Sequence, residues 1–377
     1  MEVSLVAKQL KDMGIDTVIG VPDSALKPFC DFMDHNEDPY FHHFVTANEG
    51  AAVGMAIGHY LGSGKPACVY MQNSGLGNAV NPITSLANEK VYGIPMLLLI
   101  GWRGMPGKKD EPQHCFMGEI TCALLEQMMI PYKVVKPDVT EEQWEKMASL
   151  AREHFKEGRQ FALVVQSGAF ETVKINKREN NWQLVREEVI AKILSMISEE
   201  DVVVSTTGKI SREVYEQSDK LRGEHRQAFL TVGGMGHASM IAYGIAIEQP
   251  HKRVYCIDGD GAALMHMGSL AFLGKEKPGN LVHICLNNDA HESVGGTKTG
   301  CAGLDYARIA ATSGYPLAET VHDMEGVQKA LHRIRQERQL SFLEIKVSLD
   351  ARNDLGRPKE TAAENKRAFM EYHEVIK

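Results

Sequence analysis

The stretch VYCIDGDGAAL, Val254–Leu264, decides how this chain folds, because an apolar run ends there in a carboxylate between two glycines. Residues 254–257 predict a buried strand and the small residues from Ala262 onward predict a helix, so the Gly-Asp-Gly forms the turn between them. Such turns bind phosphates. A leucine stands where a dinucleotide fingerprint needs a third small residue, and the Asp260 carboxylate would repel a pyrophosphate. The stretch therefore predicts a diphosphate site that requires a cation.

Strand and helix patterns alternate along both halves of the chain. The expected strands are 17–21, 41–45, 67–71, 96–100, 133–135, 161–165, 202–205, 228–232, 254–257, 281–286, 316–320 and 342–347. This spacing predicts an α/β protein with two doubly wound parallel-sheet domains and helices on both faces of each sheet. The polar stretch 173–188 is interpreted as a linker, so the first domain spans residues 1–172 and the second 189–377.

Composition narrows the class of protein. The 377 residues are 44% hydrophobic and 24% charged, which is typical of a soluble globular protein of two domains. A net charge of -8 argues against broad nucleic-acid contact, and apolar runs such as 95–100 are too short to span a membrane. The start of the chain lacks the basic residues of a signal peptide, and the seven cysteines include no C-x-x-C pair. We therefore expect reduced thiols and a cytoplasmic location.

A second polar turn follows the next expected strand, at NNDA in residues 287–290. The carboxylate of Asp260, the amide oxygen of Asn288 and the backbone carbonyl of Ala290 would give Mg²⁺ an all-oxygen ligand set, with positions left for diphosphate oxygens and water. Taken alone, each segment also fits an ordinary tight turn.

Together, in this order and at this spacing, the two segments resemble the diphosphate motif of the thiamine-diphosphate-dependent 2-oxo acid decarboxylases. The resemblance implies the thiamine-diphosphate-binding fold and a glutamate from the other domain that hydrogen-bonds the cofactor's aminopyrimidine. Glu49, in TANEGAA at the start of a small-residue helix, matches this role. The alternative is a capping box that begins at Thr46, in which Glu49 satisfies only a backbone amide.

Two glycine turns supply the remaining cofactor contacts that the resemblance implies. In FLTVGGMGHASM, Gly233 offers a backbone carbonyl to the 4'-amino group and Met235 keeps the cofactor bent; in STTGKISREV, the first turn contacts the diphosphate. Either segment could instead be an ordinary strand-to-helix turn. The full expected cofactor set is Glu49, Thr206, Thr207, Gly208, Gly233, Met235, Gly259, Asp260, Gly261, Ala262 and Asn288.

Without a central third domain, the chain is similar to the phosphonopyruvate and sulfopyruvate decarboxylases within this family. GVPDSALKPF, YMQNSGLGN and LIGWRGMPGKKDEPQH are more similar to the phosphonopyruvate branch, although Met105 and Lys108 depart from its pattern. The resemblance implies decarboxylation of 3-phosphonopyruvate to phosphonoacetaldehyde in phosphonate biosynthesis, with sulfopyruvate as the alternative substrate. It also implies a homo-oligomer, a dimer at least, with active sites at the subunit interface.

A doubly anionic substrate calls for guanidinium and ammonium groups. Arg103, Lys108, Lys109 and His114 lie in one loop after an expected strand, and His114 is a candidate proton donor or oxyanion partner. Other expected substrate contacts are Asp23, Ser24 and His291. The alternative for the loop is a solvated basic segment, and His291 could simply belong to a surface loop.

Two other functions stay open on the sequence alone. A carboligase would use the same cofactor but direct the activated carbon to a second carbonyl group. A non-catalytic Mg²⁺-diphosphate binding protein would use Glu49 as a helix cap, and nucleotide diphosphates would then compete with thiamine diphosphate.

Overall fold

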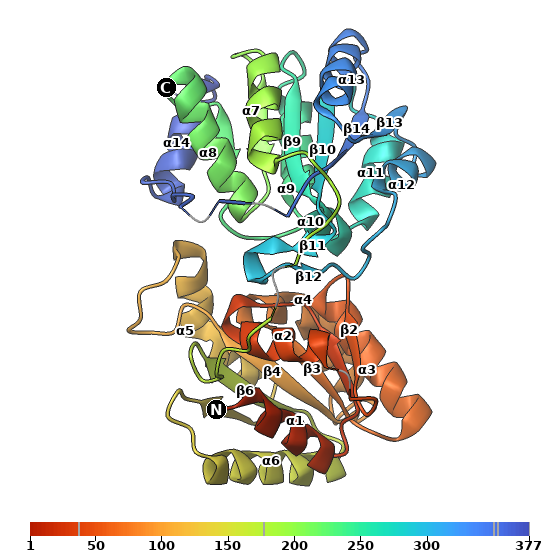
Figure 1. Cartoon of the computed structure of the whole chain (residues 1–377), viewed down its shortest axis with the longest axis vertical. Helices are drawn as coiled ribbons and strands as arrows, with labels where there is room; N and C mark the ends of the chain where they lie inside the picture. Colours follow the sequence, from red (N-terminus) through yellow and green to blue (C-terminus); the bar gives the residue numbers. More distant parts are fainter. Residues whose placement is uncertain (37, 176–177, 350, 353, 377) are drawn as a thin grey trace. The chain divides into compact units, whose positions relative to one another are not determined.

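The chain forms two six-stranded sheets, each built of parallel strands and flanked by helices (Figure 1). The structure, a computed structural model, describes residues 1–36, 38–175, 178–349, 351–352 and 354–376. It divides into two units, one of Met1–Lys177 with His291–Gly300 and the other of Arg178–Ala290 with Cys301–Lys377. The predicted α/β class with two parallel-sheet domains is confirmed. The segment His291–Gly300, which the sequence division assigns to the second domain, belongs to the first unit.

The first sheet is parallel throughout. Its strands, in sheet order, are β2 (His42–Val45), β1 (Thr17–Gly20), β3 (Ala67–Gln72), β4 (Met96–Trp102), β6 (Phe161–Gln166) and β5 (Tyr132–Val135). Its helices are α1 (Val3–Asp12), α2 (Lys27–His35), α3 (Glu49–Ser63), α4 (Leu76–Pro82), α5 (Pro112–Gln127) and α6 (Glu141–Lys156).

Strand β4 explains why the strands of this sheet read as continuous apolar runs. Leu97 and Leu99 pack into a core cluster with Trp144 of α6, whereas Leu98 and Ile100 belong to a separate core cluster that includes residues of α3 and α4. Successive side chains of a strand point to opposite faces, so a strand covered on both faces must be apolar at every position.

The second sheet is also parallel. Its strands, in sheet order, are β13 (Leu317–Val321), β14 (Ser341–Lys346), β10 (Leu281–Asn287), β9 (Val254–Gly259), β7 (Val202–Ser205) and β8 (Ala228–Leu230). Its helices are α7 (Arg186–Met196), α8 (Lys209–Arg222), α9 (Ala238–Glu248), α10 (Asp260–Met265), α11 (Gly268–Glu276), α12 (Tyr306–Thr312), α13 (Met324–Gln336) and α14 (Ala362–Tyr372). Two short strands, β11 (Ala290–His291) and β12 (Thr297–Lys298), pair with each other.

Each sheet has a point where the order of its strands reverses. The neighbours of β1 are β2 on one side and β3 on the other, and the neighbours of β7 are β8 and β9. Ligands of open parallel sheets bind at such points, beyond the carboxyl ends of the strands. Asp23 and Ser24 follow β1, Thr206 follows β7 and Asp260 follows β9, so the predicted site residues occupy these positions.

Most of the predicted strand boundaries are off by one or two residues, and three differences affect the site or the division into domains. Helix α10 begins at Asp260, not Ala262, so the turn after β9 is tighter than expected. Strand β8 ends at Leu230 because the Thr231 hydroxyl donates to the carbonyl of Ser205 at 2.7 Å, which replaces the continuing ladder. Helix α7 begins inside the predicted linker.

Within the described residues, no helix combines the length and apolar character needed to cross a membrane.

Candidate active site

Glu49 is the first residue of α3, and its carboxylate is buried against the loop after β3. The residue is 5% exposed and accepts a hydrogen bond from Nδ2 of Asn78 at 2.7 Å. Gly75 lies so close that a Cβ there would come within 2.5 Å of Oε1 of Glu49. The helix is capped instead by Asn48, whose side chain accepts a backbone N–H of the first turn. The alternative in which Glu49 forms a capping box with Thr46 is therefore wrong.

Arg103 directly follows β4, and hydrogen bonds from its guanidinium to Asp110 and Ser24 fix its orientation. Its Nε donates to Oδ2 of Asp110 at 2.8 Å, its Nη2 to Oδ1 at 2.5 Å, and its Nη1 to the Ser24 hydroxyl at 2.7 Å. The bond to Arg103 holds the pKa of Asp110 well below its usual range and raises the pKa of the guanidinium. The pair is therefore ionised at neutral pH, and it fixes the orientation of a cationic group beside Ser24.

Asp23 organises the turn that carries Ser24. It is 1% exposed, and its Oδ1 accepts from Nε2 of Gln72 at 2.6 Å while its Oδ2 accepts the N–H of Ala25 at 3.0 Å. Burial raises the pKa of Asp23, although the Gln72 bond and the charge of Arg103 act in the opposite direction. Since both oxygens are already bonded within the protein, Asp23 is suited to position Ser24.

The other basic residues predicted in this loop occupy different environments. His114, in the first turn of α5, is half-buried, and burial lowers its pKa, with the charge of Arg103 acting in the same direction. Lys108 and Lys109 are exposed. The structure thus brings Ser24, Arg103 and His114 into one neighbourhood and leaves the two lysines at the surface.

The segment His291–Gly300 lies beside the turn that leads to Glu49. A Cβ on Gly300 would come within 2.4 Å of the carbonyl of Val45, so the two backbones are in close contact. Nε2 of His291 is buried and has no hydrogen-bond partner among the described residues. Burial lowers the pKa of His291 to about 4, so its ring is neutral at pH 7.

Three loops of the second unit meet at the carboxyl ends of β7, β8 and β9. The Thr207 hydroxyl donates to the carbonyl of Val232 at 2.9 Å, which joins the loop after β7 to the glycine loop after β8. A Cβ on Gly236, which has a φ of +91°, would lie 3.2 Å from the carbonyl of Ala262, so the glycine loop contacts α10. The predicted residues of the first two loops are Thr206, Thr207, Gly208, Gly233 and Met235. At the third strand, Gly259 ends β9, and Asp260, Gly261 and Ala262 form the first turn of α10.

Unsatisfied carboxylate oxygens mark the predicted metal position. Asp260 is 3% exposed, and neither its Oδ2 nor the buried Oδ1 of Asp289 has a hydrogen-bond partner in the described part of the chain. Burial raises the pKa of Asp260 to about 7, and the charge of Asp289 adds to this shift. Asn288 is also buried, with Oδ1 accepting the N–H of Ala290 at 3.1 Å. Two carboxylates with buried, unsatisfied oxygens favour a bound cation, which fits Asp260 as a predicted Mg²⁺ ligand. Asn288 and the carbonyl of Ala290 remain the other predicted ligands.

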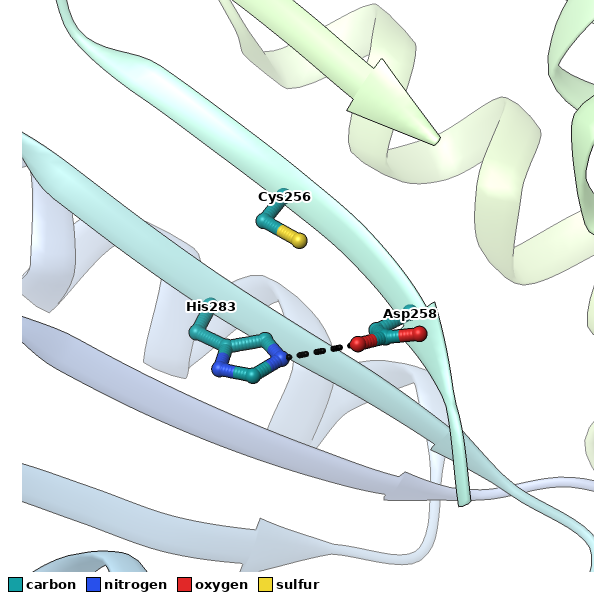
Figure 2. A group of neighbouring side chains, drawn as sticks. All are labelled: Cys256, Asp258 and His283. Carbon is teal, nitrogen blue, oxygen red and sulfur yellow. Dashed lines mark hydrogen bonds and ion pairs between the residues drawn. The ribbon is translucent and has the colours of Figure 1, made fainter. Parts of the chain in front are cut away.

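A second group of metal-ligand side chains lies on β9 and β10 (Figure 2). The ligand atoms of Cys256, Asp258 and His283 are within 4.8 Å of one another. Asp258 already lies 3.3 Å from Nε2 of His283, and its other oxygen accepts the N–H of Gly259 at 2.9 Å. Burial raises the pKa of the Cys256 thiol well above its usual range, which disfavours the thiolate that binds metals. We interpret this group as internal support for the turn that carries Asp260.

Three polar residues that contact the predicted site residues were not predicted from sequence patterns. Asn78 and Asp110 stand inside motifs that it used, YMQNSGLGN and LIGWRGMPGKKDEPQH, but only the fold shows that they bond Glu49 and Arg103. Asp289 had a local signal, because it adjoins the predicted ligand Asn288.

Comparison with known proteins places both units in one family. The N-terminal TPP binding domain of thiamine pyrophosphate enzymes matches residues 3–125, and the corresponding C-terminal domain matches residues 207–345. A phosphonopyruvate decarboxylase of Streptomyces viridochromogenes is 34% identical over 379 residues, covering 96% of this chain and 92% of that protein. The chain belongs to the phosphonopyruvate decarboxylase family of thiamine pyrophosphate enzymes.

Other members of the family match along most of their length. A phosphonopyruvate decarboxylase of Streptomyces hygroscopicus is 33% identical over 382 residues, covering 96% of this chain and 92% of that protein. A sulfopyruvate decarboxylase of Methanosarcina acetivorans is 27% identical over 361 residues, covering 89% of this chain and 88% of that protein. The protein is therefore a thiamine-diphosphate-dependent decarboxylase, for which Mg²⁺ is the usual partner metal, and the non-catalytic alternative is set aside.

Proposed function

We propose that this enzyme decarboxylates 3-phosphonopyruvate to phosphonoacetaldehyde and CO₂ in phosphonate biosynthesis. The observation that carries the proposal is the Arg103 guanidinium, which Asp110 holds in a fixed orientation beside the Ser24 hydroxyl. A planar guanidinium suits the oxygens of a phosphonate. The greater identity to phosphonopyruvate decarboxylases, 34% against 27% for the sulfopyruvate enzyme, supports the same substrate.

Thiamine diphosphate, when bound, supplies a nucleophilic carbon that adds to the 2-oxo group and takes up the electron pair that departing CO₂ leaves. Asp260, Asn288 and the carbonyl of Ala290 would hold the Mg²⁺ that neutralises the diphosphate. Thr206, Thr207 and Gly208 would contact the diphosphate, while Gly233 and Met235 would hold the pyrimidine side of the cofactor.

Glu49 would hydrogen-bond the aminopyrimidine and so activate the cofactor. Asn78 already fixes its Oε2, and Gly75 packs so closely against the carboxylate that a side chain there would clash with Oε1. A carboxylate that is 5% exposed and held in one orientation meets the requirement for a group that must act on a single ring nitrogen.

The groups around Arg103 divide the remaining tasks. Arg103 and Ser24 would bind the phosphonate, and the exposed Lys108 and Lys109 would raise the local concentration of anions. His114 has a lowered pKa and is uncharged at neutral pH, so it would donate a hydrogen bond to the developing oxyanion or relay the product proton. The buried, neutral ring of His291 would act as a second hydrogen-bonding group.

A decarboxylation assay tests the proposed function. The enzyme, thiamine diphosphate and Mg²⁺ are supplied in turn with phosphonopyruvate, sulfopyruvate and pyruvate, and the aldehyde product is followed with a coupled dehydrogenase. We expect a strong preference for phosphonopyruvate. Preference for sulfopyruvate would overturn the substrate assignment, and turnover only when a second carbonyl compound is added would indicate a carboligase.

Replacing Arg103 with lysine should weaken phosphonate recognition even though the charge is kept. Lysine cannot bridge Asp110 and Ser24 simultaneously with a planar fork, so kcat/KM for phosphonopyruvate should fall about 10- to 100-fold, mostly through KM. Steady-state kinetics checks this, with Lys146→Met, an exposed lysine on α6, as the control that should change kcat/KM less than about threefold. An equal loss with pyruvate would show that Arg103 does not recognise the phosphonate.

We also propose a homo-oligomer, a dimer at least, with active sites at the subunit interface. Helix α3, which begins with Glu49, exposes Met55 and Leu61 at 37% and 72%. Its exposed face otherwise carries small residues and lacks charged side chains. Contiguous exposed apolar surface of this kind indicates a protein interface.

All seven cysteines are free thiols, which supports a reducing, cytoplasmic location.

Met55→Glu should dissociate the oligomer, because a charge placed at the centre of an apolar interface loses its hydration without gaining a partner. Light scattering after size exclusion should give the dimer mass for the wild type and the monomer mass for the variant. Leu221→Glu, on α8, changes a side chain that is 49% exposed and serves as the control that stays dimeric. A wild-type monomer, or a dimeric Met55→Glu, would contradict the proposal.

A further inference from the structure

Glu344 is a fully buried carboxylate on the strand next to one edge of the second sheet. It lies on β14, has 0% exposure, and receives four donors. Nδ2 of Asn287 and Nζ of Lys346 each lie 2.7 Å from its Oε1. The N–H of Ala307 at 3.2 Å and the hydroxyl of Thr320 at 2.9 Å donate to its Oε2. A buried charge with this many partners fixes the position of every group that it contacts.

The hydrogen bond from Asn287 connects Glu344 to the loop that carries the predicted ligands Asn288 and Ala290. Asn287 donates to Glu344 through Nδ2, and through Oδ1 it accepts the N–H of Asp289 at 2.9 Å. Asp289 has a φ of +59°, a left-handed conformation that is unfavourable for a residue other than glycine. The Asn287 side chain therefore connects Glu344 to the N–H of Asp289, across Asn288. These bonds stabilise the left-handed conformation of Asp289 and so fix the shape of the loop.

A second set of hydrogen bonds connects Glu344 to Asp260. Ala307, which donates to Glu344, lies in the first turn of α12 next to Tyr306. The hydroxyl of Tyr306 donates to the backbone carbonyl of Asp260 at 3.0 Å. A single carboxylate thus connects the two segments that supply metal ligands, through Asn287 on one side and through Ala307 and Tyr306 on the other.

Lys346 gives the network its charge balance. Its side chain is 10% exposed, and its ammonium lies over the ring of Trp182, 5.0 Å from the centroid. Trp182 closely follows Asn180, whose Nδ2 donates to the carbonyl of Asn288 at 3.2 Å. The segment 180–182 therefore contacts both Lys346, through Trp182, and the metal loop, through Asn180.

We infer that Glu344 is a positioning residue for the Mg²⁺–diphosphate site, acting on Asn288 through Asn287 and on Asp260 through Tyr306. The inference rests on the proposed metal site. Groups that orient metal ligands from behind typically change metal affinity about 10- to 100-fold when they are replaced. Glutamine at position 344 keeps the shape but must turn an NH₂ toward groups that are themselves donors, so at least one contact becomes repulsive.

A metal-binding experiment tests the inference without relying on turnover. Mn²⁺ is titrated into the full-length protein at saturating thiamine diphosphate, and unbound Mn²⁺ is measured by electron paramagnetic resonance. We expect Glu344→Gln to weaken Mn²⁺ binding about 10- to 100-fold and Asn287→Ala to do the same. The double variant should lose less affinity than the product of the two single losses, because both changes break the shared Glu344–Asn287 bond.

Glu213→Gln is the matched control. Glu213 is another buried carboxylate of the same unit, paired with Arg186 at 2.7 and 2.8 Å, and it makes no contact with the metal loop among the interactions described. It should lower the unfolding temperature while leaving Mn²⁺ affinity within about twofold. A folded Glu344→Gln that binds Mn²⁺ as tightly as the wild type, or fully additive losses in the double variant, would overturn the inference.

If Glu344→Gln does not fold, Thr320→Val gives a milder test. It removes one bond to the distal oxygen of the same carboxylate, and Mn²⁺ affinity should fall about three- to tenfold. Unchanged affinity in this variant would overturn the inference. A wild-type protein that binds Mn²⁺ with thiamine diphosphate yet does not decarboxylate phosphonopyruvate would refute the proposed substrate and leave the role of Glu344 intact.

Discussion

Glu49→Gln is expected to lower kcat by about 10²- to 10⁴-fold, the range that a positioned acid–base group contributes. Glutamine keeps the shape of the side chain and its bond from Asn78, so the cofactor should still bind with an affinity within about threefold of the wild type. Single-turnover kinetics at saturating cofactor, together with titration of thiamine diphosphate, separates the two effects. Turnover equal to that of the wild type would remove Glu49 from the mechanism.

Asn78→Ala serves as a control that separates the orientation of Glu49 from its charge. Asn78→Ala removes only the donor that fixes Oε2 of Glu49, at 2.7 Å, and leaves the carboxylate itself. We expect a loss of kcat of about 10-fold, equivalent to one hydrogen bond of ordinary strength to a charged group. A loss as large as that of Glu49→Gln would mean that orientation, and not the carboxylate, accounts for the effect.

Local sequence patterns correctly predicted the fold, and they led to the prediction of the metal-ligand loops, because both depend on neighbouring residues. The buried run before Asp260, and the turn at Asn287 after the next apolar run, identified adjacent parallel strands. The carboxyl ends of parallel strands lie at one edge of a sheet, so the predicted metal ligands could be brought together from sequence alone. The confirmed sheets follow from the same reasoning.

Contacts between distant residues could not be predicted in this way. Asn287 and Glu344 are separated by 57 positions, and no periodicity indicates that their side chains meet. Asp110 lies only seven positions from Arg103, but the bend that pairs them depends on the packing of the loop against α5. The capping pattern at Thr46 failed because Asn48, two residues later, caps the helix instead.

Asp260→Asn should abolish tight Mg²⁺-dependent cofactor binding and, without metal, make the protein more stable. Burial raises the pKa of Asp260 to about 7, above the unfolded value of 3.8. Folding therefore disfavours the ionised form of Asp260. Its carboxylate does not destabilise the folded state below about pH 4, where it is protonated in both states. The destabilisation grows between about pH 4 and pH 7 and is complete above about pH 7. Asparagine removes both the desolvation of the charge and its repulsion by Asp289.

Thermal unfolding in EDTA measures this difference. At pH 8 the variant should exceed the wild type by on the order of 1 to 4 kcal/mol, and at pH 4 the two should nearly coincide. Adding Mg²⁺ and thiamine diphosphate should reverse the order, because only the wild type gains the free energy of a ligand that binds the native state. A variant less stable than the wild type at pH 8 in EDTA would mean that the Asp260 carboxylate has a cationic partner within the protein. Its unsatisfied oxygen would then no longer indicate a metal site.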